Sequence, residues 1–345
     1  MELTERKEKI LQAVISDYIR TAEPVGSKTL SKMYGLEFSP ATIRSELADL
    51  EEMGYLTHPH TSAGRVPSDK GYRWYVNNIL EWKEPTATSK NIIDEKLYAE
   101  KEELEKTIEH ATEILSRITN LTSFATTPKK EEEKLKSINL LPVDEKTAVL
   151  MIISDSGKVS NKAIKLRLPM SEERLKHLAD KLTQSYLGKT VSEALTNNII
   201  ANIEDDYIQM SGIANEVMPG FKKTLEEMMD VDFYIEGLSK IFDIPEYSDI
   251  NKAKNFIDLL TRKEDIMRKI QERDDGIAIS IGEENTDEDL KNCSVITASY
   301  MVNGKPVGKI GVIGPTRMKY SEIVSLMGYL THNMNEVFKI GDIDE

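Results

Sequence analysis

Residues 39–56 read SPATIRSELADLEEMGYL, and this stretch predicts a single helix that is bounded at both ends and runs into a strand. Ser39 is a suitable N-cap, because its hydroxyl can accept a hydrogen bond from a free backbone N–H of the first turn. Pro40 suits the first helical position, and Gly54 suits the left-handed residue that ends a helix. The helix should therefore run from Pro40 to Met53.

The two faces of this helix differ. Apolar residues recur at i, i+4 and i+7 and predict one buried stripe: Ile43, Leu47 and Leu50. At ~100° per residue, the opposite face carries the small residues Ala41, Ser45 and Ala48, flanked by Thr42 and Arg44. Such a face can lie close to base edges in a major groove. The residues predicted to read bases are Ala41, Thr42, Arg44 and Ser45.

Two further helices precede it. Apolar positions predict a first helix over residues 4–20, and Pro24 interrupts the chain after it. Ser27 can cap a short second helix that stops at Gly35. Because the last two helices are short and closely joined, the pattern predicts a helix-turn-helix.

A two-stranded ribbon is predicted after the third helix. Residues 55–57 and 65–67 read as short strands joined by turn formers. Residues 57–66 contain no acidic side chain, so this wing can approach phosphates or enter a minor groove. Ser68 can cap a fourth helix. The predicted contacts of this winged helix-turn-helix to the DNA backbone are Ser27, Lys28, His58, His60, Arg65, Lys70 and Arg73.

Overall charge limits what such a module can bind. The chain has 345 residues and a formal net charge of −14, and residues 1–82 carry 10 Lys+Arg against 12 Asp+Glu. An acidic chain repels phosphate, so non-specific coating of nucleic acid is excluded, whereas a specific site depends on the local surface. A helix-turn-helix can also contact protein, and the pattern alone leaves this alternative open.

Cysteine usage and hydropathy indicate a compartment. The single cysteine, Cys293, excludes an internal disulfide framework and fits a reducing cytosol. The first residues, MELTERK, lack the apolar core of a signal peptide, and the longest strongly apolar run, residues 148–153, is too short to span a bilayer. We expect a cytoplasmic protein without a membrane partner.

The remaining chain predicts an α+β fold split by an insertion. Residues 83–89 form a linker, and residues 90–124 predict one long helix whose heptad seam serves either a subunit contact or packing within its own domain. Two groups of strands are expected to form an antiparallel sheet: 135–141, 147–154 and 162–167, then 276–282, 293–302 and 306–313. A helix over residues 321–338 follows them. The mainly helical residues 171–230 lie between the two groups and therefore read as an insertion.

Several motifs carry a family likeness. They are LQAVISDYI at 11–19, EPVGSKTL at 23–30, SPATIR at 39–44, HTSAGRVP at 60–67, GYRWYV at 71–76 and GKIGVIGP at 308–315. In this combination they resemble the HrcA heat-inducible transcription repressors, and the likeness covers most of the chain. Ser68 departs from the pattern, where threonine is expected, but either hydroxyl can cap a helix.

The resemblance implies a negative regulator of class I heat-shock (chaperone) operons. Such a repressor binds an inverted-repeat operator, CIRCE, as a homodimer, and is released or inactivated on heat shock. Its partners would be double-stranded DNA, a second copy of the chain and the chaperonin GroEL, which modulates activity. The alternative is a ligand-sensing or protein-interaction module whose winged helix contacts protein.

The resemblance also implies a division into domains. A winged helix would occupy residues 1–82. A GAF-like α+β domain with an antiparallel sheet would combine residues 83–170, which include the linker and the long helix, with residues 231–345. An inserted, mainly helical dimerisation domain would occupy residues 171–230.

No residue pattern indicates catalysis. The regularly spaced glycines of residues 308–314 do not form a dinucleotide fingerprint, because no helix opens after them in register, and we expect them to allow close packing in a strand. His58 and His60 lack a third metal ligand nearby, and the acidic residues 283–289 lack the spacing of an EF-hand. We expect no enzyme, no metal site and no cofactor.

Overall fold

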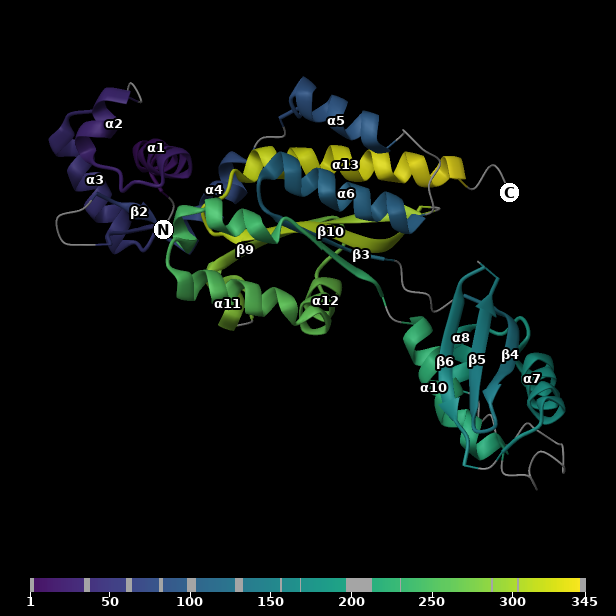
Figure 1. The fold of residues 1–345 in the computed structure, drawn as a ribbon. Helices are drawn as coiled ribbons and strands as arrows, with labels where there is room; N and C mark the ends of the chain where they lie inside the picture. Colours follow the sequence, from purple (N-terminus) through teal and green to yellow (C-terminus); the bar gives the residue numbers. More distant parts are fainter. Residues whose placement is uncertain are drawn as a thin grey trace. The chain divides into compact units, whose positions relative to one another are not determined.

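The computed structural model describes residues 3–33, 38–59, 64–80, 83–97, 104–127, 133–155, 157–167, 169–196, 213–229, 231–286, 288–302 and 304–341. The chain divides into two compact units, residues 1–127 with 233–345, and residues 128–232. Helices and antiparallel sheets occur in both, so the fold is mixed α+β and multidomain (Figure 1). Among the described helices, none has the length and apolar character needed to cross a bilayer.

The N-terminal module, residues 3–80 of the first unit, consists of helices and a two-stranded antiparallel ribbon. Its elements are α1 (Glu5–Thr21), α2 (Ser27–Met33), α3 (Pro40–Glu52), β1 (Leu56–Thr57), β2 (Val66–Pro67) and α4 (Asp69–Ile79). The predicted cap of α3 is confirmed, because the Ser39 hydroxyl accepts a hydrogen bond from the Thr42 backbone N–H. Gly54 has the left-handed φ of +80° that the sequence predicted. Ile43, Leu47 and Leu50 are buried as one stripe against the rest of the module.

The central domain, residues 83–127 and 233–341, is built on a five-stranded antiparallel sheet of order β7-β3-β10-β9-β8. Its strands are β3 (Thr122–Thr126), β7 (Phe233–Glu236), β8 (Ile277–Ile281), β9 (Cys293–Val302) and β10 (Lys305–Pro315). One face is covered by α6 (Leu104–Thr119) and α13 (Tyr320–Gly341), with α5 (Ala87–Leu97) packed on the outside of these two helices, and the other face by α11 (Ile250–Thr261) and α12 (Lys263–Gln271) (Figure 1). Short 3-10 helices connect these elements: η2 (Leu238–Asp243), η3 (Pro245–Tyr247), η4 (Gly282–Glu284) and η5 (Glu288–Leu290).

The second unit has a sheet of its own. Its strands are β4 (Leu135–Asp144), β5 (Thr147–Ser154) and β6 (Val159–Lys165), paired antiparallel in that order. Its helices are α7 (Glu172–Tyr186), α8 (Val191–Thr196) and α10 (Ile213–Met229). Alternate strand residues such as Leu150 and Ile152 pack against these helices in one hydrophobic core.

This second sheet corrects the expected pairing of the strands. We expected residues 135–141, 147–154 and 162–167 to share a sheet with the C-terminal strands, and that expectation is wrong. The two strand groups form separate sheets, and the independent unit begins before β4 rather than at residue 171. The reason is that short turns join β4 to β5 and β5 to β6, so these three strands pair with one another. Among the described residues, none of the three strands pairs with a strand of the central sheet.

The expected long helix over residues 90–124 is also wrong at its C-terminal end. Residues 98–103 lie outside the described residues, α6 ends at Thr119, and Thr122–Thr126 is the central strand β3. Ile108, Ala111 and Leu115 are fully buried against the helix's own domain. This burial favours packing within the domain over a coiled-coil contact between subunits.

Gly311 gives a stability prediction. It pairs with Thr297 on β9, and a Cβ there would lie 2.6 Å from the Phe124 ring and closer still to the Ile296 carbonyl oxygen. The expected role of the strand glycines in close packing is therefore confirmed at this position. Gly311→Ala should lower the free energy of unfolding by about 1–3 kcal/mol, because the extra methyl group overpacks the core. Urea denaturation followed by circular dichroism measures this, with Gly26→Ala as the control, since a Cβ at Gly26 would meet open space.

Candidate nucleic-acid interface

The first turns of α3 present the predicted reading face. Ala41, Arg44 and Ser45 are exposed, and Thr42 is half-buried. The Thr42 backbone N–H donates to the Ser39 hydroxyl at 3.1 Å, and the two hydroxyl oxygens lie 2.9 Å apart. The cap therefore holds Thr42 in place, while the opposite side of the helix is fixed by its buried stripe.

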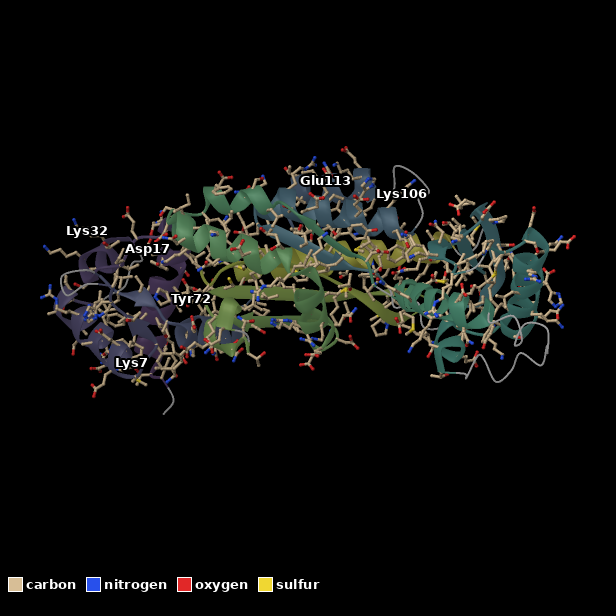
Figure 2. All side chains as sticks on the ribbon, turned by 60° about the horizontal axis from the view of Figure 1, so that its bottom comes forward. Lys7, Asp17, Lys32, Tyr72, Lys106 and Glu113 are labelled. Atoms are coloured by element: carbon tan, nitrogen blue, oxygen red, sulfur yellow. The ribbon has the colours of Figure 1, made fainter. Side chains whose placement is uncertain are left out.

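Helix α2 packs against α3 and begins with two of the predicted backbone contacts. Ser27 is buried, whereas Lys28 is exposed. Figure 2 shows Lys32, at the other end of the same helix, on the surface of the module. Lys28 is therefore accessible to a phosphate from solvent, whereas Ser27 is largely covered by the protein.

Acidic residues of α3 are neutralised from within the module. Glu46 is only 4% exposed and forms ion pairs with Lys7 and, at 2.5 Å, with Arg6. Lys7 also reaches Asp49 at 2.6 Å, and hydrogen bonds to Asp49 and Glu46 raise the pKa of Lys7. These pairs reduce the negative field beside the reading face, which would otherwise repel phosphate.

The sequence reasoning missed Arg6 and Lys7. Their signal was present in the pattern, because Glu46 lies three residues after Ile43 and hence on the core side of the helix. A carboxylate on a core face needs a cationic partner. The identity of that partner could not be read from the sequence, since α1 lies far from α3 along the chain.

Cations of the predicted wing contact the C-terminal end of α3. Glu51 contacts His58 Nδ1 and, at 2.7 Å, Arg65 Nε, and the Arg65 side chain is 25% exposed. The Arg65 backbone also exchanges hydrogen bonds of 2.8 and 2.9 Å with Val25. His60 and the rest of the predicted wing tip, residues 60–63, lie outside the described residues.

The two cations of α4 are engaged by the chain itself. Lys70 donates to the Met53 carbonyl at 2.8 Å and lies over the Tyr55 ring. Arg73 donates from Nε to Glu284 at 2.7 Å and from Nη2 to the Ile279 carbonyl at 2.7 Å. Arg73 is therefore part of a contact with the central domain rather than an open phosphate ligand.

The arginines and lysines among the predicted site residues therefore fall into two groups. The side chains of Arg44 and Lys28 are exposed and make no ion pair or hydrogen bond with other described residues. Arg65, Lys70 and Arg73 all have partners within the chain. The arrangement can bring one arginine and one lysine to a polyanion from adjacent helices. Within the described ranges, no group of three or more His, Cys, Asp or Glu residues could hold a metal ion.

Comparison with known proteins identifies relatives over almost the whole chain. The family model described as "HrcA protein C terminal domain" matches residues 105–324. A heat-inducible transcription repressor HrcA of Clostridium tetani is 40% identical, with 99% of this chain and 98% of the relative covered. Another, from Alkaliphilus metalliredigens, is 39% identical, with 98% of this chain and 99% of the relative covered.

A solved structure shares the fold. It is titled "Crystal structure of a hypothetical protein at 2.2 A resolution" and matches with a TM-score of 0.66 at 23% identity, covering 99% of this chain and all of the other. At that identity, the likeness concerns the fold alone. The family match and the near full-length relatives show that the chain belongs to the HrcA family of heat-inducible transcription repressors.

Proposed function

We propose that this protein represses class I heat-shock operons by binding an inverted-repeat operator of the CIRCE type as a dimer. In this proposal the N-terminal module is a winged helix, α3 enters the major groove and β1–β2 form the wing. The central domain is GAF-like. Heat shock releases or inactivates the repressor, and the chaperonin GroEL modulates its activity.

One observation carries the DNA-binding part of the proposal. The exposed face of α3 presents Ala41, Arg44 and Ser45, while the acids Glu46 and Asp49 behind it are paired with cations. A net charge of −14 would otherwise oppose binding to DNA. Local neutralisation therefore lets a chain of acidic composition approach a chosen site and leave bulk DNA alone.

The dimeric part is supported by an open sheet face in the second unit. The strands alternate, so one face packs on the helices and the other does not. The central positions on this open face are Ser137, Asn139, Leu141, Val149, Met151, Ile153, Val159, Asn161 and Ala163. Leu141 and Val159 are each 49% exposed. Contiguous exposed apolar patches mark interaction sites in soluble proteins.

Charge favours a second copy of the chain as the partner of this face. The nine central positions of the open face are uncharged, although 30% of the chain is Asp, Glu, Lys or Arg. Charge enters this face at its end, where Thr147 pairs with Lys165 on one side and Asp144 on the other, two residues of opposite sign. A two-fold interface brings each patch against itself, so any net charge on it would repel its own copy. A neutral apolar face avoids that repulsion in a protein of strongly negative net charge.

Fluorescence anisotropy on three duplexes tests the proposal. The duplexes are an inverted-repeat operator, a single half-site and a random sequence, each titrated at two salt concentrations. A dimer that engages two half-sites should bind the inverted repeat most tightly, by roughly 10³-fold or more over random DNA. Equal affinity for all three duplexes would exclude the operator model.

One observation favours the ligand-sensing alternative. A cavity of about 460 Å³ in the first unit is lined by apolar residues such as Ile118, Leu121 and Met318 and by the charged Arg317. Its volume falls in the range of small-molecule sites. A thermal-shift screen of small organic anions, paired with the anisotropy titration, distinguishes a sensor that ignores DNA from an operator-binding repressor.

A further inference from the structure

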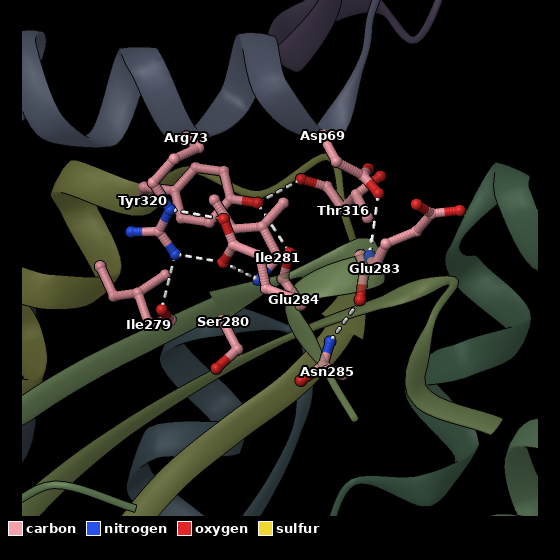
Figure 3. Close-up of polar contacts among 12 residues, drawn as sticks. Asp69, Arg73, Ile279, Ser280, Ile281, Glu283, Glu284, Asn285, Thr316 and Tyr320 are labelled. Carbon is pink, nitrogen blue, oxygen red and sulfur yellow. Dashed lines mark hydrogen bonds and ion pairs between the residues drawn. The ribbon is translucent and has the colours of Figure 1, made fainter. Parts of the chain in front are cut away.

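Helix α4 is fastened to the central domain by polar contacts along one side (Figure 3). Arg73 makes two contacts with the Glu284 carboxylate and a third with the Ile279 carbonyl. Glu284 also accepts a hydrogen bond of 2.9 Å from the Ile281 backbone N–H, which fixes the carboxylate in place. Because the pair is bidentate and its acceptor is fixed, it restricts both the distance of α4 from the central domain and the orientation of the helix.

Asp69, one turn earlier on α4, adds a second point of attachment. Its carboxylate accepts a hydrogen bond of 3.0 Å from the Glu283 backbone N–H. The fit is close, because a Cβ at Gly282 would collide with the Asp69 carboxylate. Asp69 and Arg73 therefore engage η4 together.

A separate ion pair attaches the end of α1. Arg317, which follows β10, binds the Glu246 carboxylate at 2.5 and 3.0 Å. The same guanidinium donates to the Ile19 carbonyl of α1 at 3.0 Å. Arg317 and Glu246 both belong to the central domain. The ion pair therefore holds the Arg317 guanidinium in place, and the hydrogen bond to the Ile19 carbonyl attaches it to the N-terminal module.

Apolar packing also joins the module to the central domain, because buried residues of both belong to one hydrophobic core. Tyr72 and Tyr320 meet with ring centroids 6.0 Å apart, and Figure 2 shows Tyr72 where the module adjoins the central domain. The buried Tyr72 hydroxyl has no hydrogen-bond partner among the described residues. The 460 Å³ cavity opens beside Arg317, between Ile19 and the linker residues Lys83 to Thr86. The cavity leaves part of this boundary unpacked, and there the polar contacts add to the apolar packing in orienting the module.

We infer that these two ion pairs, Arg73–Glu284 and Glu246–Arg317, position the N-terminal module on the central domain and thereby set the operator geometry that the dimer accepts. The inference rests on the proposed function, because it assigns the pairs a role in choosing the half-site spacing. A dimer with rigidly held modules binds two half-sites only at one separation and helical phase. With the pairs broken, each module keeps its apolar packing and the Asp69 and Arg317 hydrogen bonds to backbone, but its orientation is less restricted, and the separation is less tightly fixed.

The test uses the full-length chain with both pairs weakened, Glu284→Gln with Glu246→Gln. Glutamine keeps an oxygen that can accept from the Ile281 N–H, and both substitutions lie outside the predicted DNA face. Glu288→Gln is the matched control, since it breaks an exposed ion pair with Lys291 that stays within the central domain. Half-site affinity should be the same for all three proteins.

Two measurements report on the variant. The first is binding to the inverted repeat with its native spacer and with the spacer lengthened by about half a helical turn, roughly 5 base pairs. The preference of the double variant for the native spacer should fall by about tenfold, while the control keeps the wild-type preference. The second is the distance distribution between spin labels at Lys32→Cys and Lys254→Cys, which should broaden in the double variant alone. Cys293 is buried and stays in place.

The outcomes separate the two proposals. An unchanged spacer preference in the double variant overturns the positioning role, whether or not the distance distribution broadens. An unchanged distance distribution overturns it as well. If the wild-type chain itself shows no preference for the inverted repeat over a half-site, the proposed function fails instead, and the distance measurement still tests whether the pairs hold the module.

Discussion

Replacing Met151 by lysine should convert the proposed dimer into monomers and reduce operator affinity to that of a single half-site. Met151 lies in the middle of β5, on the open face, between Asn139 and Asn161 of the neighbouring strands. In a two-fold interface the new ammonium groups would be buried without a counter-ion and near each other. Burying an unpaired charge costs several kcal/mol. That cost is a large share of the free energy that holds a dimer together.

The unit itself should stay folded, because the side chain at position 151 points away from the helices that form the core. Gln184→Lys is the matched control. It adds the same charge to an exposed position of α7, on the helix-covered side of the same unit. Sedimentation velocity should show monomers for M151K and dimers for Q184K, with unchanged circular dichroism for both. A dimer that survives in M151K would place the subunit contact elsewhere.

The features predicted correctly from the sequence are those with local causes. The Ser39 cap and the left-handed Gly54 depend only on neighbours within a few residues. The stripe of Ile43, Leu47 and Leu50 depends only on helical periodicity. The bounds of the strands before and after each short turn were also close, because turn chemistry is local.

The sheet assignment failed because strand pairing is not local. The strands β5 and β9 are both rich in apolar residues, and neither sequence indicates which sheet its strand joins. The short strands β3 and β7 were missed, since Thr122–Thr126 continues the apolar pattern of α6 and Phe233–Glu236 has only four residues. Both pair with partners far along the chain.

The same limit applied to the candidate site. The exposure of Arg44 followed from helix geometry and was predicted. The engagement of Arg73 was not, because its partner Glu284 is separated from it by 211 positions. A pattern of cations near a helix start indicates where positive charge is available, and the tertiary fold decides what neutralises it.

Arg44→Ala should lower operator affinity by about 1–3 kcal/mol and relax base preference at one position in each half-site. The reason is that Arg44 lies exposed on the capped first turns of α3 with its guanidinium unengaged by the described residues, so it is available for a bidentate contact with a guanine edge. Binding to random DNA should change much less, because that binding comes from phosphates. Anisotropy titrations against the operator and a set of single-base variants measure both effects.

Lys28→Ala is the informative comparison, because it removes one positive charge from a neighbouring exposed position. A lysine that contacts a phosphate carries no base information, so K28A should weaken all duplexes alike and reduce the salt slope of log K by about one. R44A should instead show a loss that depends on the base pair. Uniform weakening in R44A would reassign Arg44 to the backbone, and a base-specific loss in K28A would place α2 in the groove. The two variants together therefore determine which helix reads the operator.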